Sequence, residues 1–476
     1  MRKQLASNKQ EFSAISKEHY DVIVIGAGVV GCAMTRRFTL QGAKVLLVEK
    51  ASDILEGASK GNSAILHTGF DEVAGSIEHQ CVTKGYQEFL EIRHKMKLPI
   101  MKTGALIVAW NAEQEAKLDS LKTIAHENGV KDVEQISALK VNQLEPNLAS
   151  CASSALHVPG EYVIDPWTTP YCYLLQGIEQ GATFLRNTQV LSGEYENSQW
   201  TLHTNQGVLS SDAIINCAGL YGDHVDQLLI KQSAFEIHPR KGQFLVYDKA
   251  ASELITKIIL PVPTKITKGV VVCRTIFGNL LVGPTADEQE SREDTGVDSE
   301  SLKQLKTQGE AILPALKHCP ITATYAGIRP ATAQHDYAIK SYPEQRYISV
   351  GGIRSTGLSG ALGIASYVYE QYLEMGYKHV EQSWYSWPSA SSIAQEGERD
   401  WQKVNNGGVV CHCELVTKRE IEKALTGPLA ARSLTALKRR TRVTMGRCQG
   451  FYCSAALSDI TEPYFDEPIA SNSNDN

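Results

Sequence analysis

Asp21-Val-Ile-Val-Ile25 is followed at once by Gly26-Ala-Gly28-Val-Val-Gly31, and this stretch decides the fold. The short β-branched run predicts a strand that is buried on both faces of a parallel sheet. Residues 29–40 have helical periodicity and end before Gly42, a common residue just past the end of a helix. A second apolar run at 43–49 predicts another strand. The sequence therefore predicts a β-α-β unit and an α/β fold.

The glycines of this turn are typical of a phosphate-binding loop. Gly26 permits a tight turn, Gly28 lets backbone N–H groups approach a pyrophosphate, and Gly31 lets the helix pack closely on the strand. Glu49 ends the second strand 18 residues after Gly31, where a carboxylate accepts hydrogen bonds from a ribose diol. Because the motif lies between a strand and a helix, a dinucleotide site is favoured over a strand-turn-helix in which Glu49 is merely solvated.

Composition and charge exclude several classes of protein. The chain has 476 residues, of which 42% are apolar and 21% are charged, so we expect about three folded units and no collagen-like, coiled-coil or mainly disordered chain. Because 47 basic residues face 53 acidic ones, no general basic field attracts nucleic acid or anionic lipid. The apolar runs are shorter than the roughly 20 residues of a membrane-spanning helix, and no transmembrane segment is expected.

Further apolar runs indicate how the units are arranged. Residues 212–219 and 347–352 return to the buried-strand pattern, so the nucleotide-binding sheet is predicted to be assembled from distant segments. Between its parts, about 95–160 and 235–325 contain short alternating runs and amphipathic helices. We expect these two segments to form an inserted α+β domain with an antiparallel sheet.

The segment that follows the β-α-β unit distinguishes between the possible dinucleotides. Gly57-Ala-Ser-Lys-Gly-Asn-Ser-Ala-Ile-Leu-His-Thr-Gly-Phe70 is rich in small residues, as expected of backbone that lies against a bulky planar ligand. Over about residues 20–375 the chain resembles the FAD-dependent D-amino-acid-oxidase-like superfamily. Within it, the chain resembles the branch of glycerol-3-phosphate dehydrogenases, L-2-hydroxyglutarate oxidases and glycine oxidases. Supporting motifs are Ile214-Ile-Asn-Cys-Ala-Gly-Leu-Tyr221, Gly278-Asn-Leu-Leu-Val-Gly-Pro-Thr285, Ala326-Gly-Ile-Arg-Pro330 and Gly351-Gly-Ile-Arg-Ser-Thr-Gly-Leu-Ser359.

This resemblance implies bound FAD and a substrate pocket beside it. Arg329 and Arg354 are implied to lie on the substrate side, where a guanidinium offers a planar fork of donors to an anionic group. A structural ion pair is the alternative for either arginine. Arg240 and Lys241 add positive charge there or form a solvated strand end. The residues implied to contact FAD are Gly26, Gly28, Gly31, Glu49, Lys50, Asn62, Ser63, Ala218, Gly219, Gly352, Gly357, Leu358 and Ser359.

The same loop carries a candidate proton acceptor. An imidazole ordinarily titrates near neutrality, so His67 could take the substrate hydroxyl proton as hydride leaves for flavin, or could instead pack beside the ring or bind backbone. Tyr325 and His335 are further candidates. A helix predicted to begin within 355–359 would direct amide donors at the flavin and stabilise its reduced, negative form.

Four of the eleven cysteines fall close together near the end of the chain. Their pattern is C-x-C, 34 intervening residues and C-x4-C, and four thiolates ligate either zinc or a [2Fe-2S] cluster. Residues 410–417 and 438–453 resemble the bacterioferritin-associated-ferredoxin-like domain, which implies [2Fe-2S] as the metal centre. Its ligands are then Cys411, Cys413, Cys448 and Cys453. The basic residues at 438–447 either lie near this cluster, form a solvated helix face or dock an acidic electron partner.

These observations predict an FAD-dependent dehydrogenase that oxidises a small anionic alcohol and passes electrons through [2Fe-2S] to a quinone or a partner redox protein. The family resemblance implies glycerol 3-phosphate as the leading substrate. The alternatives are a 2-hydroxy acid or a small amino acid as the substrate, and a non-catalytic electron-transfer subunit. The first 19 residues lack the apolar core of a secretory signal, so we expect a cytoplasmic protein, with the mitochondrial matrix left open. It could form a homo- or hetero-oligomer. We divide the chain into an N-terminal extension at 1–19, an oxidoreductase domain at 20–382, a linker at 383–408, a small helical [2Fe-2S] domain at 409–456 and a tail at 457–476.

Overall fold

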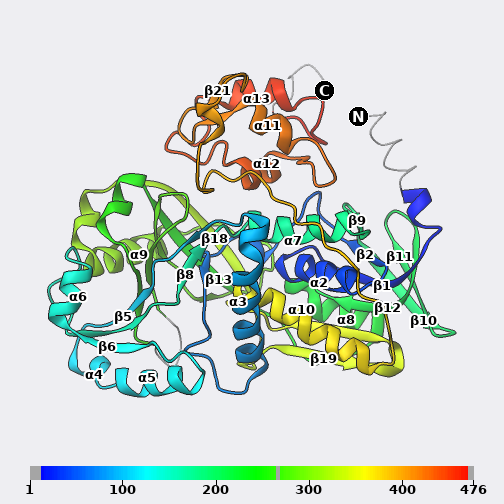
Figure 1. The fold of residues 1–476 in the computed structure, drawn as a ribbon, viewed down its shortest axis with the longest axis horizontal. Helices are drawn as coiled ribbons and strands as arrows, with labels where there is room; N and C mark the ends of the chain where they lie inside the picture. Colours follow the sequence, from blue (N-terminus) through cyan, green and yellow to red (C-terminus); the bar gives the residue numbers. More distant parts are fainter. Residues whose placement is uncertain (1–11, 264–268, 470–476) are drawn as a thin grey trace.

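The structure, a computed structural model, describes residues 12–263 and 269–469. Most of the expected N-terminal extension and the last residues of the expected tail therefore lie outside the described residues. Two large sheets lie side by side, and the small C-terminal unit, in orange and red, lies across both of them in Figure 1. No helix within the described ranges is long and apolar enough to cross a membrane.

The first sheet has eight strands and forms the predicted nucleotide-binding core. Its order is β10-β11-β12-β1-β2-β9, with β20 beside β12 and β19 beside β20. Strands β1, β2, β9, β12 and β20 run parallel to one another, and hairpins add the remaining strands antiparallel. The bounds are β1 His19–Ile25, β2 Val45–Val48, β9 Thr183–Leu185, β10 Val190–Glu196, β11 Gln199–Thr204, β12 Val208–Asn216, β19 Ala338–Tyr342 and β20 Tyr347–Gly351. The prediction of an α/β sheet built from distant segments is confirmed.

Helices pack tightly against this sheet. They are α2 Val29–Leu40, α3 Ile77–Met96, α7 Thr168–Glu179, α8 Gly222–Ile230 and α10 Gly357–Glu374. The backbones of α3 and α10 approach closely at two glycines, because a Cβ on Gly85 would lie 2.3 Å from the Ser359 carbonyl oxygen, and one on Gly363 would lie 2.0 Å from that of Cys81. The start of α10 is thereby held against α3, next to the loop that carries His67.

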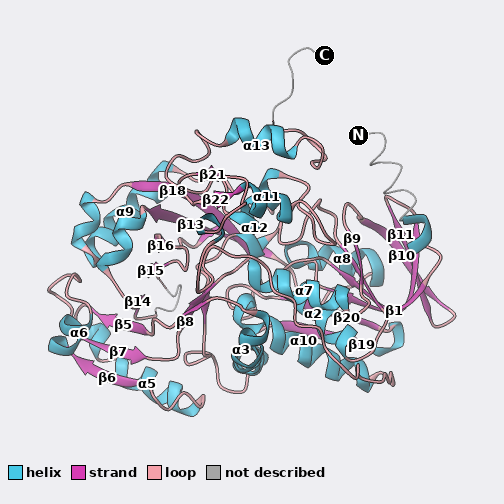
Figure 2. Ribbon diagram, turned by 45° about the horizontal axis from the view of Figure 1, so that its top comes forward, coloured by secondary structure: helices cyan, strands magenta, loops and turns pink. Residues whose placement is uncertain are grey.

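The second sheet has nine strands in the order β17-β13-β16-β15-β14-β5-β7-β6, with β18 beside β13. We expected it to be antiparallel throughout, but β14 and β5 pair in parallel. Only hairpin-linked strands are constrained to be antiparallel, and these two come from separate segments of the chain. The strands are β5 Ala105–Ala109, β6 Glu134–Ser137, β7 Ser154–Val158, β13 His238–Tyr247, β14 Ile258–Pro261, β15 Val271–Arg274, β16 Leu280–Gly283, β17 Asp287–Glu288 and β18 Ile321–Ala331. The helices beside them are α4 Ala112–Glu115, α5 Leu118–Glu127, α6 Ala138–Leu144 and α9 Ser299–Ile312. Figure 2 shows α5, α6 and α9 at the edge of this sheet.

A small three-stranded sheet carries the loop of the predicted proton acceptor. It pairs β3 Ile65–Leu66 and β4 Ile100–Met101 with β8 Tyr162–Ile164, so that residue 67 is brought beside residue 161. The backbone at Gly61 packs directly on the backbone of β18, since a Cβ on Gly327 would lie 2.3 Å from the Gly61 carbonyl oxygen. The loop at 57–70 is therefore enclosed between the two large sheets.

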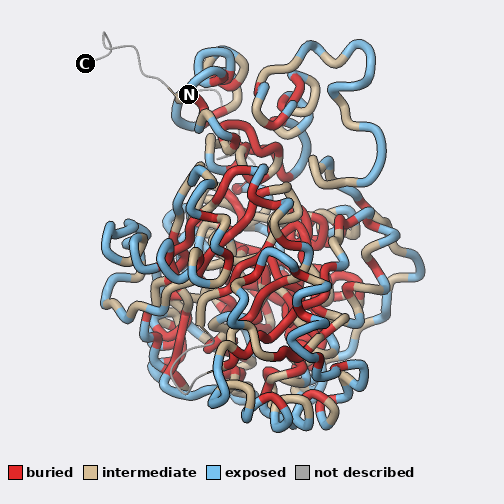
Figure 3. Tube along the Cα trace, turned by 90° about the vertical axis from the view of Figure 1, so that its left-hand side faces the viewer, coloured by how far each residue is buried: buried red, intermediate tan, exposed pale blue. Residues whose placement is uncertain are grey.

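The C-terminal unit contains β21 Val409–Cys411, β22 Val416–Thr417, α11 Lys418–Ala424, α12 Leu434–Thr441 and α13 Ser454–Thr461. It has a core of its own, and Figure 3 shows buried stretches at the top of the molecule as well as in the two sheets. We placed the tail at 457–476, but Leu457 is fully buried in this core and Phe465 is only 6% exposed. Because polar residues separate Leu457 from Phe465, the sequence did not indicate that both side chains belong to this core. The unit extends to at least Phe465.

Candidate functional site

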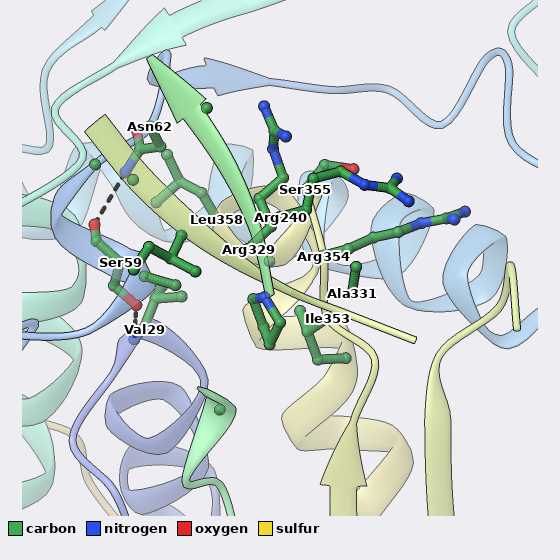
Figure 4. Close-up of a pocket in the computed structure, with 18 of the residues that line it drawn as sticks. Val29, Ser59, Asn62, Arg240, Arg329, Ala331, Ile353, Arg354, Ser355 and Leu358 are labelled. Atoms are coloured by element: carbon green, nitrogen blue, oxygen red, sulfur yellow. Dashed lines mark hydrogen bonds between the residues drawn. The ribbon is translucent and has the colours of Figure 1, made fainter. Parts of the chain in front are cut away.

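A cavity of about 1560 Å³ lies between the two large sheets. Its walls come from the glycine turn before α2, the loop at 57–63, β18 and the residues that lead into α10. Figure 4 shows Val29 and Ser59 at one side of this pocket, and Arg240, Arg329 and Arg354 together at the other. The cavity therefore has a dinucleotide end and a cationic end.

The glycine turn has the close contacts that its sequence predicts. Gly26 has a φ of +101°, and a Cβ there would lie 2.6 Å from the Cys217 carbonyl oxygen. A Cβ on Gly31 would lie 1.9 Å from the Gly26 carbonyl oxygen, so the start of α2 rests directly on the turn. Gly28 lines the cavity itself, where a Cβ would meet only Ser59 Oγ at 3.1 Å. A pyrophosphate fits at Gly28, whereas Gly26 and Gly31 shape the turn.

Glu49 lies at the end of β2 and lines the same part of the cavity. Its Oε2 accepts the Ala27 N–H at 2.7 Å and its Oε1 accepts the Ala51 N–H at 2.8 Å. Burial raises the pKa of this carboxyl, and the two backbone donors oppose that effect. The carboxyl is thereby held in a fixed orientation, in which its oxygens can also accept hydrogen bonds from a ribose diol.

The other predicted FAD contacts divide into two groups. Most of them line the cavity, namely Lys50, Asn62, Ser63, Ala218, Gly219, Gly357 and Leu358. Three are not among the lining residues of the described chain, namely Gly31, Gly352 and Ser359. Ser359 acts from behind the wall, where its Oγ accepts the His67 N–H at 2.8 Å. Asn62 donates to the Ser59 carbonyl oxygen and accepts the Ala64 N–H, so its side chain holds the loop in shape.

Arg329 on β18 provides a desolvated positive charge at the cationic end. Its Nη2 donates to the Thr285 carbonyl oxygen at 3.0 Å, and no carboxylate of the described residues forms an ion pair with it. Burial first, and then the nearby Arg240, lower the pKa of Arg329 to about 10, so the guanidinium stays charged at neutral pH. Gly242 leaves the room for it, since a Cβ there would lie 2.5 Å from Nη2.

Arg354 and Arg240 are bound more extensively to other residues. Arg354 Nη2 donates to the His335 carbonyl oxygen at 2.5 Å, Nη1 lies 3.0 Å from His335 Nδ1, and Nη2 lies 3.7 Å from Glu78 Oε2. Arg240 pairs with Glu288 through its Nε at 2.6 Å. The structural alternative for Arg354 is therefore partly realised, although its side chain still lines the cavity.

His67 also lines the cavity, and its side chain is 21% exposed. Its Nδ1 lies 2.8 Å from Oε2 of Glu161, whose side chain is completely buried. Tyr325, a weaker candidate, stacks on Phe244 and donates its hydroxyl to the Asn62 carbonyl oxygen at 2.8 Å, which are structural roles. Sequence analysis missed Glu161, and the available signal was a single acid directly before an apolar strand.

The four predicted ligand cysteines come together as two pairs of thiols. Cys413 contacts Cys448, and Cys411 contacts Cys453. In the described ranges, no group of three or more His, Cys, Asp or Glu surrounds a single ion position. Four neighbouring thiols, grouped as two pairs, fit a two-iron cluster in which each iron takes two cysteines.

Backbone donors surround one of these thiols. The N–H groups of Tyr452, Gly450 and Phe451 lower the pKa of Cys448, with Tyr452 as the largest contribution. Burial raises the pKa of Cys453 to about 11. Hydrogen bonds of this kind to a ligand sulfur are one means by which a protein tunes an iron–sulfur cluster.

Most of the basic run at 438–447 joins the C-terminal unit to the rest of the protein. Arg439 and Arg440 both pair with the buried Asp53, and Arg439 also pairs with Glu56. Arg447 binds Asp248 through two contacts of 2.8 Å. Glu56 also lines the cavity, so the docked unit touches the loop that follows the ribose end of the dinucleotide site.

A glycine-turn dinucleotide site, a cationic cavity and two pairs of thiols together define an iron–sulfur flavoprotein oxidoreductase. The chain belongs to the FAD dependent oxidoreductase family, which matches residues 21–371. Residues 409–462 match the BFD-like [2Fe-2S] binding domain. The cofactors are therefore FAD and a [2Fe-2S] cluster.

Similar proteins include dehydrogenases and oxidases of glycerol 3-phosphate, and also L-2-hydroxyglutarate dehydrogenases, one of which, from Indibacter alkaliphilus, is 30% identical over 56% of this chain and 68% of its own. A glycerol 3-phosphate dehydrogenase of Caloramator mitchellensis is 30% identical over 93% of both chains. A glycerol 3-phosphate oxidase of Mycoplasma pneumoniae is 29% identical over 73% of this chain and 93% of its own. The dithionite-reduced L-alpha-glycerophosphate oxidase of Mycoplasma pneumoniae, with FAD bound, superposes with a TM-score of 0.73 at 26% identity, over 79% of this chain and all of the other.

Proposed function

We propose that the protein is a dehydrogenase that oxidises glycerol 3-phosphate and passes the electrons through its [2Fe-2S] cluster to an external acceptor. The observation that carries the choice of an anionic substrate is Arg329, a partly buried guanidinium that faces the cavity and forms no ion pair with a carboxylate of the described chain. An anionic substrate would provide the missing counter-charge, because a buried charge is costly unless it is paired.

The residues of the cationic end would divide the work between binding and proton transfer. Arg329 and Arg354 would hold the phosphate, since each guanidinium offers a fork of donors. His67 would accept the hydroxyl proton of the substrate, and the start of α10, where Gly357 and Leu358 line the cavity, would stabilise negative charge. The bound FAD supplies the hydride acceptor for this oxidation.

The C-terminal unit would carry the electrons out of the oxidoreductase domain. Cys411, Cys413, Cys448 and Cys453 would hold the cluster in a docked unit. Buried ion pairs to Asp53 attach this unit to the nucleotide-binding domain, and Arg447, which is mostly exposed, attaches it to Asp248 after β13. A fixed docking geometry suits electron transfer within a single chain. The 93% overlap with a glycerol 3-phosphate dehydrogenase supports a dehydrogenase that spans both units.

Anaerobic reduction of the flavin tests the choice of substrate. The purified holoenzyme is mixed with glycerol 3-phosphate, L-2-hydroxyglutarate or glycine, and the flavin absorbance is followed in a stopped-flow instrument. We expect rapid bleaching with glycerol 3-phosphate alone. Bleaching by the 2-hydroxy acid or the amino acid in its place would reassign the substrate. Bleaching by none of the three compounds would favour a subunit whose flavin only relays electrons.

A further inference from the structure

Glu161 contacts the imidazole of His67, the proposed proton acceptor, and could orient it. Its side chain is fully buried, and its two carboxylate oxygens have different partners. Oε2 lies 2.8 Å from His67 Nδ1. Oε1 accepts both the Thr68 N–H at 2.7 Å and the Thr68 hydroxyl at 2.9 Å. The carboxylate is thus fixed by Thr68 on one side and presented to the imidazole on the other.

We infer that Glu161 is a positioning residue that keeps the proton of His67 on Nδ1 and thereby makes Nε2 the nitrogen that accepts the substrate proton. An ionised carboxylate only accepts hydrogen bonds, so the nitrogen that faces it carries a proton. The other nitrogen of a neutral imidazole is then the basic one. The orientation is fixed at the backbone as well, because the His67 N–H donates to Ser359 Oγ at 2.8 Å.

The inference rests on the proposed oxidation of an alcohol. As the C–H bond breaks, the hydride leaves for FAD, the hydroxyl proton moves to Nε2, and the carbon–oxygen bond becomes a ketone. A buried carboxylate also stabilises the imidazolium that forms, as in hydrolytic triads in which an acid orients a histidine. Glu161 itself transfers no proton in this step.

The Glu161→Gln variant separates tautomer control from packing. The Thr68 N–H can only donate, so the amide oxygen of Gln would take the position of Oε1, and the amide NH₂ would face His67 Nδ1. Because that NH₂ only donates, Nδ1 would have to accept, and the imidazole proton would move to Nε2. The substitution keeps the shape of the side chain and reverses the tautomer.

Glu145 provides a matched control. It is a buried glutamate at 1% exposure whose Oε1 accepts the N–H and the hydroxyl of Thr256, as Glu161 accepts those of Thr68, but it is not a residue of the cavity wall. We expect Glu145→Gln to keep the wild-type rate of flavin reduction. In Glu161→Gln, FAD content should stay normal while the rate falls at least roughly 100-fold, the lower end of what a positioned general base contributes. A rate within about twofold of wild type would overturn the inference.

A second measurement does not depend on the substrate. In ¹⁵N-histidine-labelled protein at about pH 8.5, above the usual histidine pKa, NMR reports which ring nitrogen carries the proton, and the His67 signals are assigned by their loss in His67→Asn. We expect Nδ1–H in the wild type and Nε2–H in Glu161→Gln. Nε2–H in the wild type would refute the role of Glu161. If no anion reduces the wild-type flavin, the proposed function fails, but the tautomer still decides this inference.

Discussion

Arg440 and Asp53 form a two-pronged ion pair across the boundary between the C-terminal unit and the nucleotide-binding domain. Nη1 lies 2.7 Å from Oδ2, and Nη2 lies 2.6 Å from Oδ1. Asp53 is 1% exposed, and Arg439 donates to the same carboxylate at 2.9 Å. One buried acid, only four residues after Glu49, therefore binds two arginines of the basic run, and Glu56 supplies a second negative charge to Arg439.

We expect Asp53→Asn to loosen the docking of the C-terminal unit. The substitution leaves the buried Arg440 without its counter-charge and leaves Arg439 with Glu56 alone, and breaking a buried pair costs about 3–5 kcal/mol. Limited proteolysis should cut within 383–408 faster than in the wild type. The matched control is Asp248→Asn, which loses an ion pair to Arg447, whose side chain is 74% exposed, and should cost at most about 1 kcal/mol. Equal cleavage of both variants would show that the Asp53 pair does not hold the unit.

The same pair should make docking sensitive to acid. Burial raises the pKa of Asp53, but Arg440 and Arg439 outweigh it and lower the pKa below the usual value. A lowered pKa in the folded state gives stability that is complete above the unfolded pKa of about 3.9 and is lost as the pH falls through the folded pKa. The stability difference between wild type and Asp53→Asn should thus be constant from pH 5 to 7 on the scale of about 3–5 kcal/mol, and should shrink below about pH 4. Chemical denaturation across this range measures it, and a difference that grows on acidification would contradict the assignment.

Two glycine substitutions should separate binding of FAD from folding. In Gly28→Val the added side chain points at Ser59 Oγ and the cavity, so we expect a folded apoprotein that lacks flavin. In Gly31→Ala the added Cβ meets the Gly26 carbonyl oxygen at 1.9 Å, so the turn itself must shift and the protein should be less stable. Flavin absorbance and circular dichroism on heating distinguish these outcomes. Full flavin content in Gly28→Val would place the pyrophosphate elsewhere.

Lysine in place of either cavity arginine should weaken substrate binding and leave FAD in place. Lysine replaces a two-pronged contact with a point charge, and we expect Arg354→Lys and Arg329→Lys each to lose on the order of 1.5–3 kcal/mol of substrate affinity. The control is Arg186→Lys, because Arg186 donates to the Ala430 carbonyl oxygen at 2.9 Å away from the cavity. Anaerobic titration of flavin reduction gives the affinity. An unchanged titration would remove that arginine from the substrate site.

The thiol pairs predict where the iron is lost. Wild-type protein prepared anaerobically should contain about two irons per chain and should give a paramagnetic signal on reduction. Cys448→Ser removes one member of the Cys413 pair, so the iron should be lost while FAD stays bound and reducible by substrate, and transfer to an acceptor should fall. Cys151→Ser, at an exposed cysteine outside the unit, should keep the iron. Zinc in the wild type, or acceptor reduction that survives Cys448→Ser, would make the unit a structural module.

Local sequence patterns predicted individual strands and helices, but they could not predict which distant strands pair with each other. The β-branched run before Gly26 and the glycine spacing depend on neighbours in sequence, so β1, the turn and α2 could be predicted closely. The parallel pairing of β14 with β5 depends on segments about 150 residues apart along the chain, and no local signal marks it. The motifs predicted which segments surround the cavity, but not which of their residues reach its surface. Ser359 was therefore expected to contact FAD, although it lies behind the cavity wall.

The same distinction explains the residues that were missed. Arg439 and Arg440 lie in a basic run that, from the sequence, could be solvated or could face the cluster. Only the fold shows that both side chains bind Asp53. Glu161 has no motif around it, and its role depends on β3 and β8 bringing His67 alongside. The role of a charged side chain depends on partners that are distant in sequence, whereas the role of the glycines in the turn can be predicted from their spacing in the sequence.

Asp53 and Arg440 are 387 positions apart in the chain. A ribosome adds about 5–20 residues per second, so Asp53 waits roughly 20–80 s during synthesis before its partner exists. The parallel sheet is completed by β20, at Tyr347–Gly351, well before the basic run is made. A nucleotide-binding domain that folds as a unit during synthesis does so with this carboxylate still hydrated, and the cysteine-bearing unit then docks over it.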